Sequence, residues 1–149
     1  MKRIGVVLIL ILAFCGLSDS LYLSQQEASN APLLCNIENL SGCNIVATSQ
    51  YSHLFGLSLA EYGVIFYAFT FIIAALELVV FDRLLRRMLQ VVSLIGIVAS
   101  LYLTFVELFV VRALCIYCLA SASIALFIFI FACLIEPLRN NSQYKPPVA

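Results

Sequence analysis

The sequence predicts an all-α integral membrane protein: a four-transmembrane-helix bundle with an extracytoplasmic capping loop that contains a short surface helix. Of its 149 residues, 64% are apolar or aromatic and 11% are charged, whereas soluble domains average about 45–50% and about 25%. The mean hydropathy is +1.09. This composition excludes a disordered protein, a coiled coil and a typical cytosolic enzyme. The net charge is zero and there is no basic run, so we expect no nucleic-acid partner.

Four apolar stretches are long enough to cross a bilayer, whose hydrocarbon core of about 30 Å requires about 20 apolar residues in a helix. The expected spans are residues 4–23, 62–81, 88–111 and 114–135, and the long polar loop between the first two is 24–61. We therefore expect one membrane domain over residues 1–138. A disordered cytoplasmic tail is expected over residues 139–149.

The basic residues predict the orientation, because Lys and Arg accumulate on the cytoplasmic side of a membrane. They precede the first span, separate the second from the third, and follow the fourth: Lys2, Arg3, Arg83, Arg86, Arg87, Arg139 and Lys145. The 24–61 loop contains no Lys or Arg, and Arg112 is the one exception to the pattern. Both termini are thus predicted in the cytoplasm and the long loop outside. We expect a bacterial inner membrane, with the ER membrane as the alternative.

An alternative interpretation makes residues 1–20 a cleaved signal peptide, since a basic start precedes an apolar run. Phe14, however, stands where a small residue is required before Cys15 in a lipoprotein-type cleavage site, and no A-x-A pattern follows. We therefore expect residues 4–23 to remain as the first span.

The six cysteines separate by their expected depth in the membrane. Cys15 and Cys133 fall inside spans, where a free cysteine behaves as a small hydrophobic residue, so we interpret both as packing residues. The remaining four all fall on the predicted outer side, and these are Cys35, Cys43, Cys115 and Cys118. The outer side of a bacterial membrane and the ER lumen are oxidising compartments, in which disulfides form and persist.

Cys115 and Cys118 form a C-x-x-C motif at the start of the fourth span. Residues three apart share one face of a helix, so the two sulfurs can form a disulfide. The N-terminus of a helix stabilises a thiolate through its dipole and free N–H groups, and Cys115 is nearest that end. Cys118 lies one turn deeper, where an apolar molecule dissolved in the bilayer can reach it. The motif therefore predicts two-electron transfer between an aqueous thiol and a lipid-soluble acceptor.

A zinc site is the main alternative for a C-x-x-C motif. It would need Cys35 and Cys43 as the second pair, but these are eight residues apart, and His53 is the only histidine. We therefore expect no metal.

The loop segment 43–55 has the pattern of a short amphipathic helix. One narrow arc of its helical wheel carries Cys43, Ala47, Tyr51 and Leu54, with Phe55 on the flank. Such a helix lies on a membrane surface with its apolar side down. It would direct Cys43 toward the mouth of the bundle and leave Cys35 exposed. We interpret the two loop cysteines as an electron shuttle, with a structural disulfide that pins the loop as the alternative.

Three acidic residues inside the spans are functional candidates by default. Glu77 lies within two turns of the predicted inner surface and is expected to reach water. Glu107 is close in depth to the C-x-x-C motif and either moves protons or snorkels to the surface. The same two interpretations apply to Asp19.

Taken together, the motifs resemble the vitamin K epoxide reductase (VKOR) family in its short, single-domain form. The matching segments are Ser20-Leu21-Tyr22, Cys35-x7-Cys43-x5-Ser49, Phe55-Gly56, Gly63-x-Ile65-Phe66-Tyr67 and Cys115-Ile116-Tyr117-Cys118. The resemblance implies a four-helix bundle around a quinone substrate (ubiquinone, menaquinone or vitamin K), capped by the first outer loop.

The resemblance also implies roles for the cysteines. Cys115 and Cys118 would be the active-site pair, joined by a disulfide, with Cys118 facing the quinone. Cys35 and Cys43 would form a second disulfide that relays electrons, through a transient Cys43–Cys115 bond. The residues expected to line the quinone are Ser49, Phe55, Phe66, Tyr67 and Leu114, and the assignment of Ser49 rests on the resemblance alone.

The expected function is that of a membrane thiol oxidoreductase that generates disulfides. It would pass electrons from a reduced thioredoxin-fold (DsbA-like) partner outside the membrane through Cys35/Cys43 and Cys115/Cys118 to a quinone. Many bacterial relatives carry a fused thioredoxin-like domain, and this chain stops at Ala149, so a separate partner is expected.

Two departures from the family's animal members favour quinone reduction over epoxide reduction. An asparagine before the glycine that matches Gly63 is replaced by the segment 57–60, and a tyrosine one turn after the C-x-x-C motif is replaced by Ala122. Two alternatives stay open. The first is a vitamin K epoxide or quinone reductase that supports another pathway, and the second is a non-catalytic tetraspan protein that binds a metal or a partner. The second predicts that replacing Cys118 leaves quinone-dependent thiol oxidation unchanged.

Overall fold

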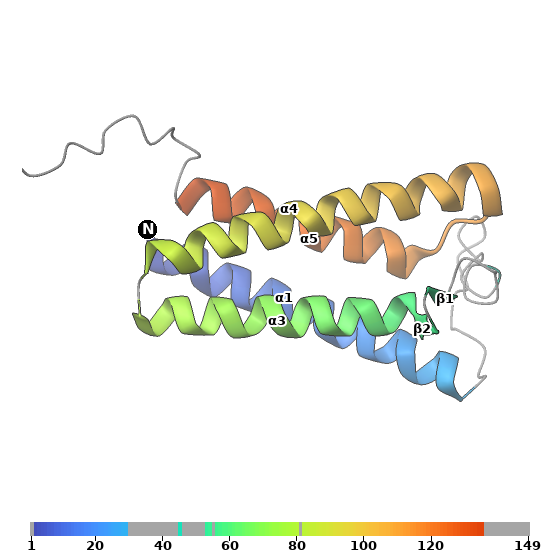
Figure 1. The fold of residues 1–149 in the computed structure, drawn as a ribbon, viewed down its shortest axis with the longest axis horizontal. Helices are drawn as coiled ribbons and strands as arrows, with labels where there is room; N and C mark the ends of the chain where they lie inside the picture. Colours follow the sequence, from blue (N-terminus) through green and yellow to red (C-terminus); the bar gives the residue numbers. More distant parts are fainter. Residues whose placement is uncertain (1, 30–44, 46–52, 55, 81, 136–149) are drawn as a thin grey trace, which may run out of the picture.

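The computed structural model describes residues 2–29, 45, 53–54, 56–80 and 82–135, and its long elements are all helices (Figure 1). These elements are α1 (Lys2–Ala28), α3 (Leu59–Val80), α4 (Arg83–Val106), the π-helix η1 (Glu107–Val111) and α5 (Ile116–Ile135). Four helical stretches are long and apolar enough to cross a membrane, with η1 continuing α4. The predicted all-α fold with four membrane-spanning helices is thereby confirmed, whereas most of the expected capping loop lies outside the described residues. The expected tail, 139–149, lies outside the described residues.

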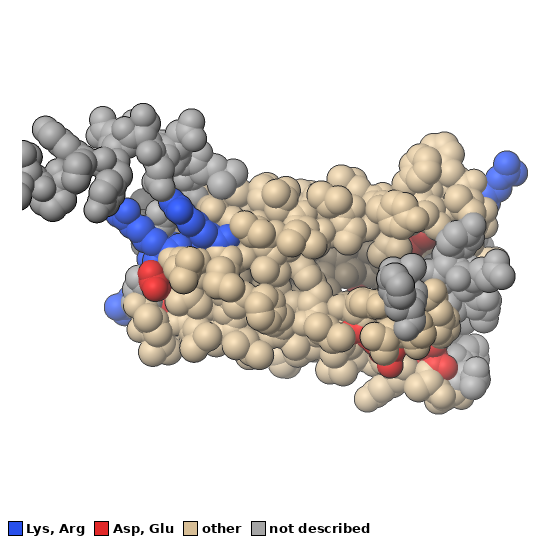
Figure 2. All heavy atoms as spheres, in the orientation of Figure 1, with Lys and Arg blue, Asp and Glu red and all other residues tan. Residues whose placement is uncertain are grey.

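The four long helices form a closed bundle. Helix α1 packs against α3 and α5, and α4 packs against α5 and α3. In Figure 1, α1 and α3 form one layer and α4 and α5 the other. The start of α1, the α3–α4 connection and the end of α5 lie at one end of the bundle, and the α4–α5 connection lies at the other. Figure 2 shows Lys and Arg gathered at the first of these ends.

The third span begins earlier than the sequence analysis predicted, at Arg83 instead of residue 88. The Asp82 side chain caps the helix by accepting a hydrogen bond from the Leu84 N–H at 3.2 Å. This bond gives a partner to one of the N–H groups that the first turn of a helix leaves unpaired. A hydropathy pattern places the start at the first apolar residue, whereas the cap extends the helix through the arginines at its polar end.

A short hairpin precedes α3. Strand β1 (His53–Leu54) pairs antiparallel with β2 (Leu57–Ser58), His53 opposite Ser58 and Leu54 opposite Leu57. Gly56 has a φ of +85°, a conformation that glycine adopts without strain. The predicted surface helix over 43–55 is therefore wrong at its C-terminal end, because cross-strand pairing replaces the helix there. Apart from Ile45, the rest of that segment lies outside the described residues.

The core of the bundle is apolar and closely packed. Its fully buried members are Ile9, Ala13, Tyr67, Ile73, Ala74, Leu89, Ile128 and Ala132. Two glycines allow large rings into it. A Cβ atom at Gly16 would lie 2.4 Å from Cε1 of Tyr67, and one at Gly96 would lie 2.4 Å from Cζ of Phe66. These glycines therefore seat the adjacent aromatic pair of α3 inside the bundle.

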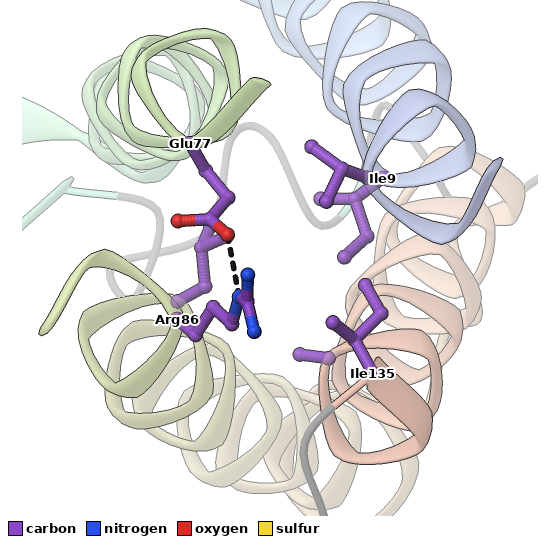
Figure 3. Close-up of a pocket in the computed structure, with 7 residues that line it drawn as sticks. Ile9, Glu77, Arg86 and Ile135 are labelled. Atoms are coloured by element: carbon purple, nitrogen blue, oxygen red, sulfur yellow. Dashed lines mark hydrogen bonds and ion pairs between the residues drawn. The ribbon is translucent and has the colours of Figure 1, made fainter. Parts of the chain in front are cut away.

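A buried ion pair lies at the basic end of the bundle (Figure 3). Glu77 on α3 is 0% exposed, and Nε of Arg86 on α4 donates to its Oε1 at 2.5 Å. Ile9 and Ile135 lie opposite the pair across a small pocket. The expectation that Glu77 reaches water is therefore wrong. The tight α3–α4 connection brings an arginine nine residues away into contact with it.

Candidate active site

The C-x-x-C motif lies at the start of α5, as the sequence analysis predicted. Cys115 directly precedes the helix, and its carbonyl accepts the Leu119 N–H at 3.1 Å. Cys118 lies in the first turn. Both cysteines are free thiols in this structure; Cys115 is 1% exposed and Cys118 is half-buried. The Cys118 thiol lies within hydrogen-bonding reach of the Cys115 sulfur.

The surroundings of Cys115 lower the pKa of its thiol. The hydrogen bond from the Cys118 thiol lowers the pKa of Cys115, and the N–H groups of Cys118 and Tyr117 lower it further. Burial and the nearby Glu107 carboxylate oppose this effect, but the net shift of the pKa is downward. This agrees with the expectation that Cys115 is the readier thiolate, because a sulfur anion at a helix N-terminus receives several donors at once.

The connection from α4 to α5 positions an acidic side chain beside the two thiols. Glu107 begins the π-helix η1 and is 4% exposed. Its Oε2 accepts the Cys115 N–H at 3.3 Å, so the carboxylate lies at the start of the helical turn that carries Cys118. The interpretation of Glu107 as a residue that snorkels to the surface is therefore wrong. Its depth along the chain suggested proximity to the motif, but only the folded turn produces the contact.

Aromatic rings cover the other side of Cys115. Tyr22 from α1 and Tyr117 from α5 both pack against it, with ring centroids 5.5 Å apart at a tilt of 44°. The sequence analysis singled out Tyr22 through the Ser20-Leu21-Tyr22 match without assigning it a contact with the cysteines. No local signal reveals this contact, because it joins the first helix to the last.

A comparison with known protein families identifies the family of this chain. The model of the vitamin K epoxide reductase family matches residues 7–133 of the 149-residue chain. The chain belongs to this family. Its members are quinone-dependent oxidoreductases of the membrane.

The predicted quinone-lining residues that the structure describes take different positions in this VKOR-family bundle. The ring of Tyr67 is 1% exposed, and its hydroxyl bonds the carbonyl and Oγ of Ser121, both at 2.8 Å. Phe66 packs edge-on against Tyr67 with centroids 5.1 Å apart. Leu114 lies half-buried directly before Cys115. Tyr67 thus ties α3 to the turn of α5 that follows Cys118, a link that the sequence analysis missed because Ser121 carries no motif.

The second cysteine pair of this VKOR-family chain lies outside the described residues. Cys35, Cys43, Ser49 and Phe55 all belong to that part, so the Cys35–Cys43 disulfide and its exchange with Cys115 stay predictions. Within the described part of the chain, no group of three or more His, Cys, Asp and Glu side chains is arranged to hold a metal ion.

Asp19 on α1 is the second acidic residue near the active site. It is half-buried, and its Oδ2 has no hydrogen-bond partner among the residues that the structure describes. Asp19 therefore directs a carboxylate oxygen into the interior of the bundle.

Proposed function

We propose that this VKOR-family protein generates disulfides: it oxidises a thioredoxin-fold partner and passes the electrons to a membrane quinone. The observation that supports the proposal most directly is the geometry of Cys115 and Cys118. One sulfur is acidic and buried at the helix start, and the other is half-buried one turn along. This asymmetry suits a pair in which one sulfur exchanges with a protein thiol and the other faces the acceptor.

The proposed reaction proceeds by thiolate exchange. The dithiol of the partner reduces the Cys35–Cys43 disulfide and becomes a disulfide itself. A loop thiolate, Cys43 by the family resemblance, then attacks Cys115 and breaks the Cys115–Cys118 bond. Cys35 resolves the mixed disulfide, which leaves the C-x-x-C pair reduced. Overall, two electrons and two protons pass from the partner dithiol to the quinone, which becomes a quinol.

The lowered pKa of Cys115 supports its role in this exchange, because a lower pKa makes a sulfur a better leaving group. The apolar bundle supports the role of the quinone, since a lipid-soluble oxidant can approach Cys118 without crossing water. We further propose that this end of the bundle faces the extracytoplasmic side, since the Lys and Arg side chains gather at the opposite end (Figure 2).

The test uses the purified full chain in detergent with a reduced thioredoxin-fold protein and a short-chain benzoquinone. Quinone absorbance should fall with the wild-type protein and stay constant with Cys118→Ala. Cys133→Ala is the matched control, because Cys133 is a half-buried cysteine of the same helix, and it should retain wild-type activity. Undiminished quinone consumption by Cys118→Ala would contradict the proposal and favour a non-catalytic tetraspan protein.

The shuttle and the orientation need separate measurements. A mixed disulfide with the partner should appear as a shifted band that reductant removes, and it should disappear in a Cys35→Ala, Cys43→Ala double variant. A band that persists in the double variant would refute the shuttle. A membrane-impermeant maleimide should label the reduced loop cysteines in intact cells; labelling only after lysis would reverse the proposed orientation.

A further inference from the structure

The local backbone turns Glu107 inward while its neighbours face outward. Glu107 is 4% exposed, whereas Leu108, Phe109 and Val110 are 48%, 67% and 51% exposed. Backbone N–H groups from the following turn, at Arg112 and Ala113, return to the Glu107 carbonyl. An acid that only snorkels would show the opposite arrangement, with the carboxylate outside. The π-helical turn, a feature that is frequent at functional sites, places the acid inside the bundle, although burying a carboxyl group costs free energy.

The left-handed Arg112 closes this turn. Its φ of 52° and ψ of 34° end the π-helix and direct the chain back toward α5 within four residues. A non-glycine residue rarely adopts this conformation. The strained turn brings Cys115 to the carboxylate eight residues earlier, so that Oε2 accepts the Cys115 N–H.

Glu107 therefore contacts the redox pair through the Cys115 backbone N–H, and Cys118 follows one helical turn later. The pair must gain protons when it is reduced and lose them when it is oxidised. The Oδ2 of Asp19, the other acid in this half of the bundle, is buried without a hydrogen-bond partner among the described residues. The geometry thus distinguishes Glu107 as the acid that is hydrogen-bonded to the C-x-x-C segment.

We propose that Glu107 is the catalytic proton-transfer residue of the C-x-x-C pair. When an incoming thiolate forms a bond to the Cys115 sulfur, the Cys115–Cys118 bond breaks and Cys118 leaves with the electron pair. The Glu107 carboxylic acid supplies the proton that makes Cys118 a thiol. The second thiol of the reductant then attacks the mixed disulfide, the reductant becomes a disulfide, and Cys115 leaves with the proton of that second thiol. In the oxidising half-reaction, the Glu107 carboxylate takes the Cys118 proton back.

In that half-reaction the two thiols deliver two electrons to the quinone and become joined by a disulfide bond. The quinone gains two protons, one from Cys118 by way of Glu107 and one from Cys115. Glu107 regains its proton from the next reductant thiol, which loses it on becoming the attacking thiolate. This second half rests on the proposed function, whereas the first requires only a dithiol reductant.

Two substitutions separate proton transfer from a purely structural contact. In Glu107→Gln, the amide oxygen still accepts the Cys115 N–H, but the side chain no longer carries a transferable proton. In Glu107→Asp, the acid is kept but is one methylene shorter, so the hydrogen bond is weakened. Proton transfer predicts that the aspartate variant is faster than the glutamine variant, and a structural role predicts the reverse. Asp19→Asn is the matched control for loss of an acid nearby.

The assay measures each half-reaction alone, in full-length protein with Cys35 and Cys43 replaced by alanine. Dithiothreitol reduces the Cys115–Cys118 disulfide, and a short-chain benzoquinone then reoxidises the pair; alkylation and gel shift report both rates. We expect Glu107→Gln to slow reduction by dithiothreitol at least tenfold, toward the roughly 100-fold or more typical of a lost general acid. Glu107→Asp should fall between this variant and the wild type, and Asp19→Asn should react at the unsubstituted rate.

The outcomes distinguish this inference from the proposed function. A glutamine variant that is as fast as wild type, or faster than the aspartate variant, overturns the role of Glu107. If the wild type reacts with dithiothreitol but not with any quinone, the proposed function fails while the order of the two variants still decides the role of Glu107. If Glu107→Gln does not fold, Glu107→Ala replaces it: added formate should restore its rate, and an absence of rescue overturns the proposal.

Discussion

Replacing Gly16 with alanine is expected to destabilise the bundle through Tyr67. The new Cβ would lie 2.4 Å from Cε1 and 2.6 Å from Cδ1 of the Tyr67 ring, so the ring or the helix has to move. The ring cannot retreat easily, because its hydroxyl is bonded to the carbonyl and Oγ of Ser121 at 2.8 Å each. Overpacking of this kind typically costs about 1–3 kcal/mol.

The same substitution at Gly5 is the matched control. A Cβ there would approach Cγ1 and Cδ1 of Ile135 at 2.8 and 2.9 Å, and the end of an isoleucine side chain can rotate away. Both glycines lie in α1, so alanine's better helix propensity, about 0.5–1 kcal/mol, contributes to both variants and cancels in the comparison. Gly16→Ala should therefore be less stable than Gly5→Ala by about 1–3 kcal/mol, roughly 5- to 150-fold in the unfolding equilibrium.

The measurement is chemical denaturation of both variants in the same detergent, followed by far-UV circular dichroism. Adding Tyr67→Leu to Gly16→Ala should remove the clash, so the two substitutions together should cost less than the sum of each alone. Equal free energies of unfolding for the two alanine variants, or strict additivity in the double variant, would refute the packing argument.

Two further predictions concern opposite ends of the bundle. Arg86→Met leaves Glu77 buried without its guanidinium partner and should cost about 3–5 kcal/mol in the same denaturation assay, whereas Arg87→Met, at an exposed position, should cost little. Because the Cys118 thiol lowers the pKa of Cys115, the pH midpoint for iodoacetamide alkylation of reduced Cys115 should lie below the roughly 8.5 of a free cysteine and rise in Cys118→Ala. An unchanged midpoint would show that this hydrogen bond does not control the acidity of Cys115.

The sequence sufficed for the four helices and for the position of the C-x-x-C motif. A bilayer demands about 20 apolar residues per span, so hydropathy reports these helices directly. The i, i+3 spacing of Cys115 and Cys118 is likewise a local property. Sequence patterns were less reliable where local and cross-strand pairing compete: the wheel of residues 43–55 favoured a helix, but the chain pairs His53 and Leu54 with the strand that leads into α3.

By itself, then, the amino-acid sequence determined the spans, the family resemblance and the candidate redox cysteines, because each depends on residue types and on their order and spacing along the chain. Only the tertiary structure decided what surrounds the sulfurs. The inward direction of Glu107 depends on a π-helical turn and the left-handed Arg112, and the covering ring of Tyr22 comes from the other end of the chain. Glu77 is a second example. From hydropathy alone an acid near the end of a span is expected to reach water, but the folded α3–α4 turn brings Arg86 into contact with it inside the bundle. Such contacts form where the chain turns back on itself, and the periodic pattern of apolar residues along the sequence does not predict them.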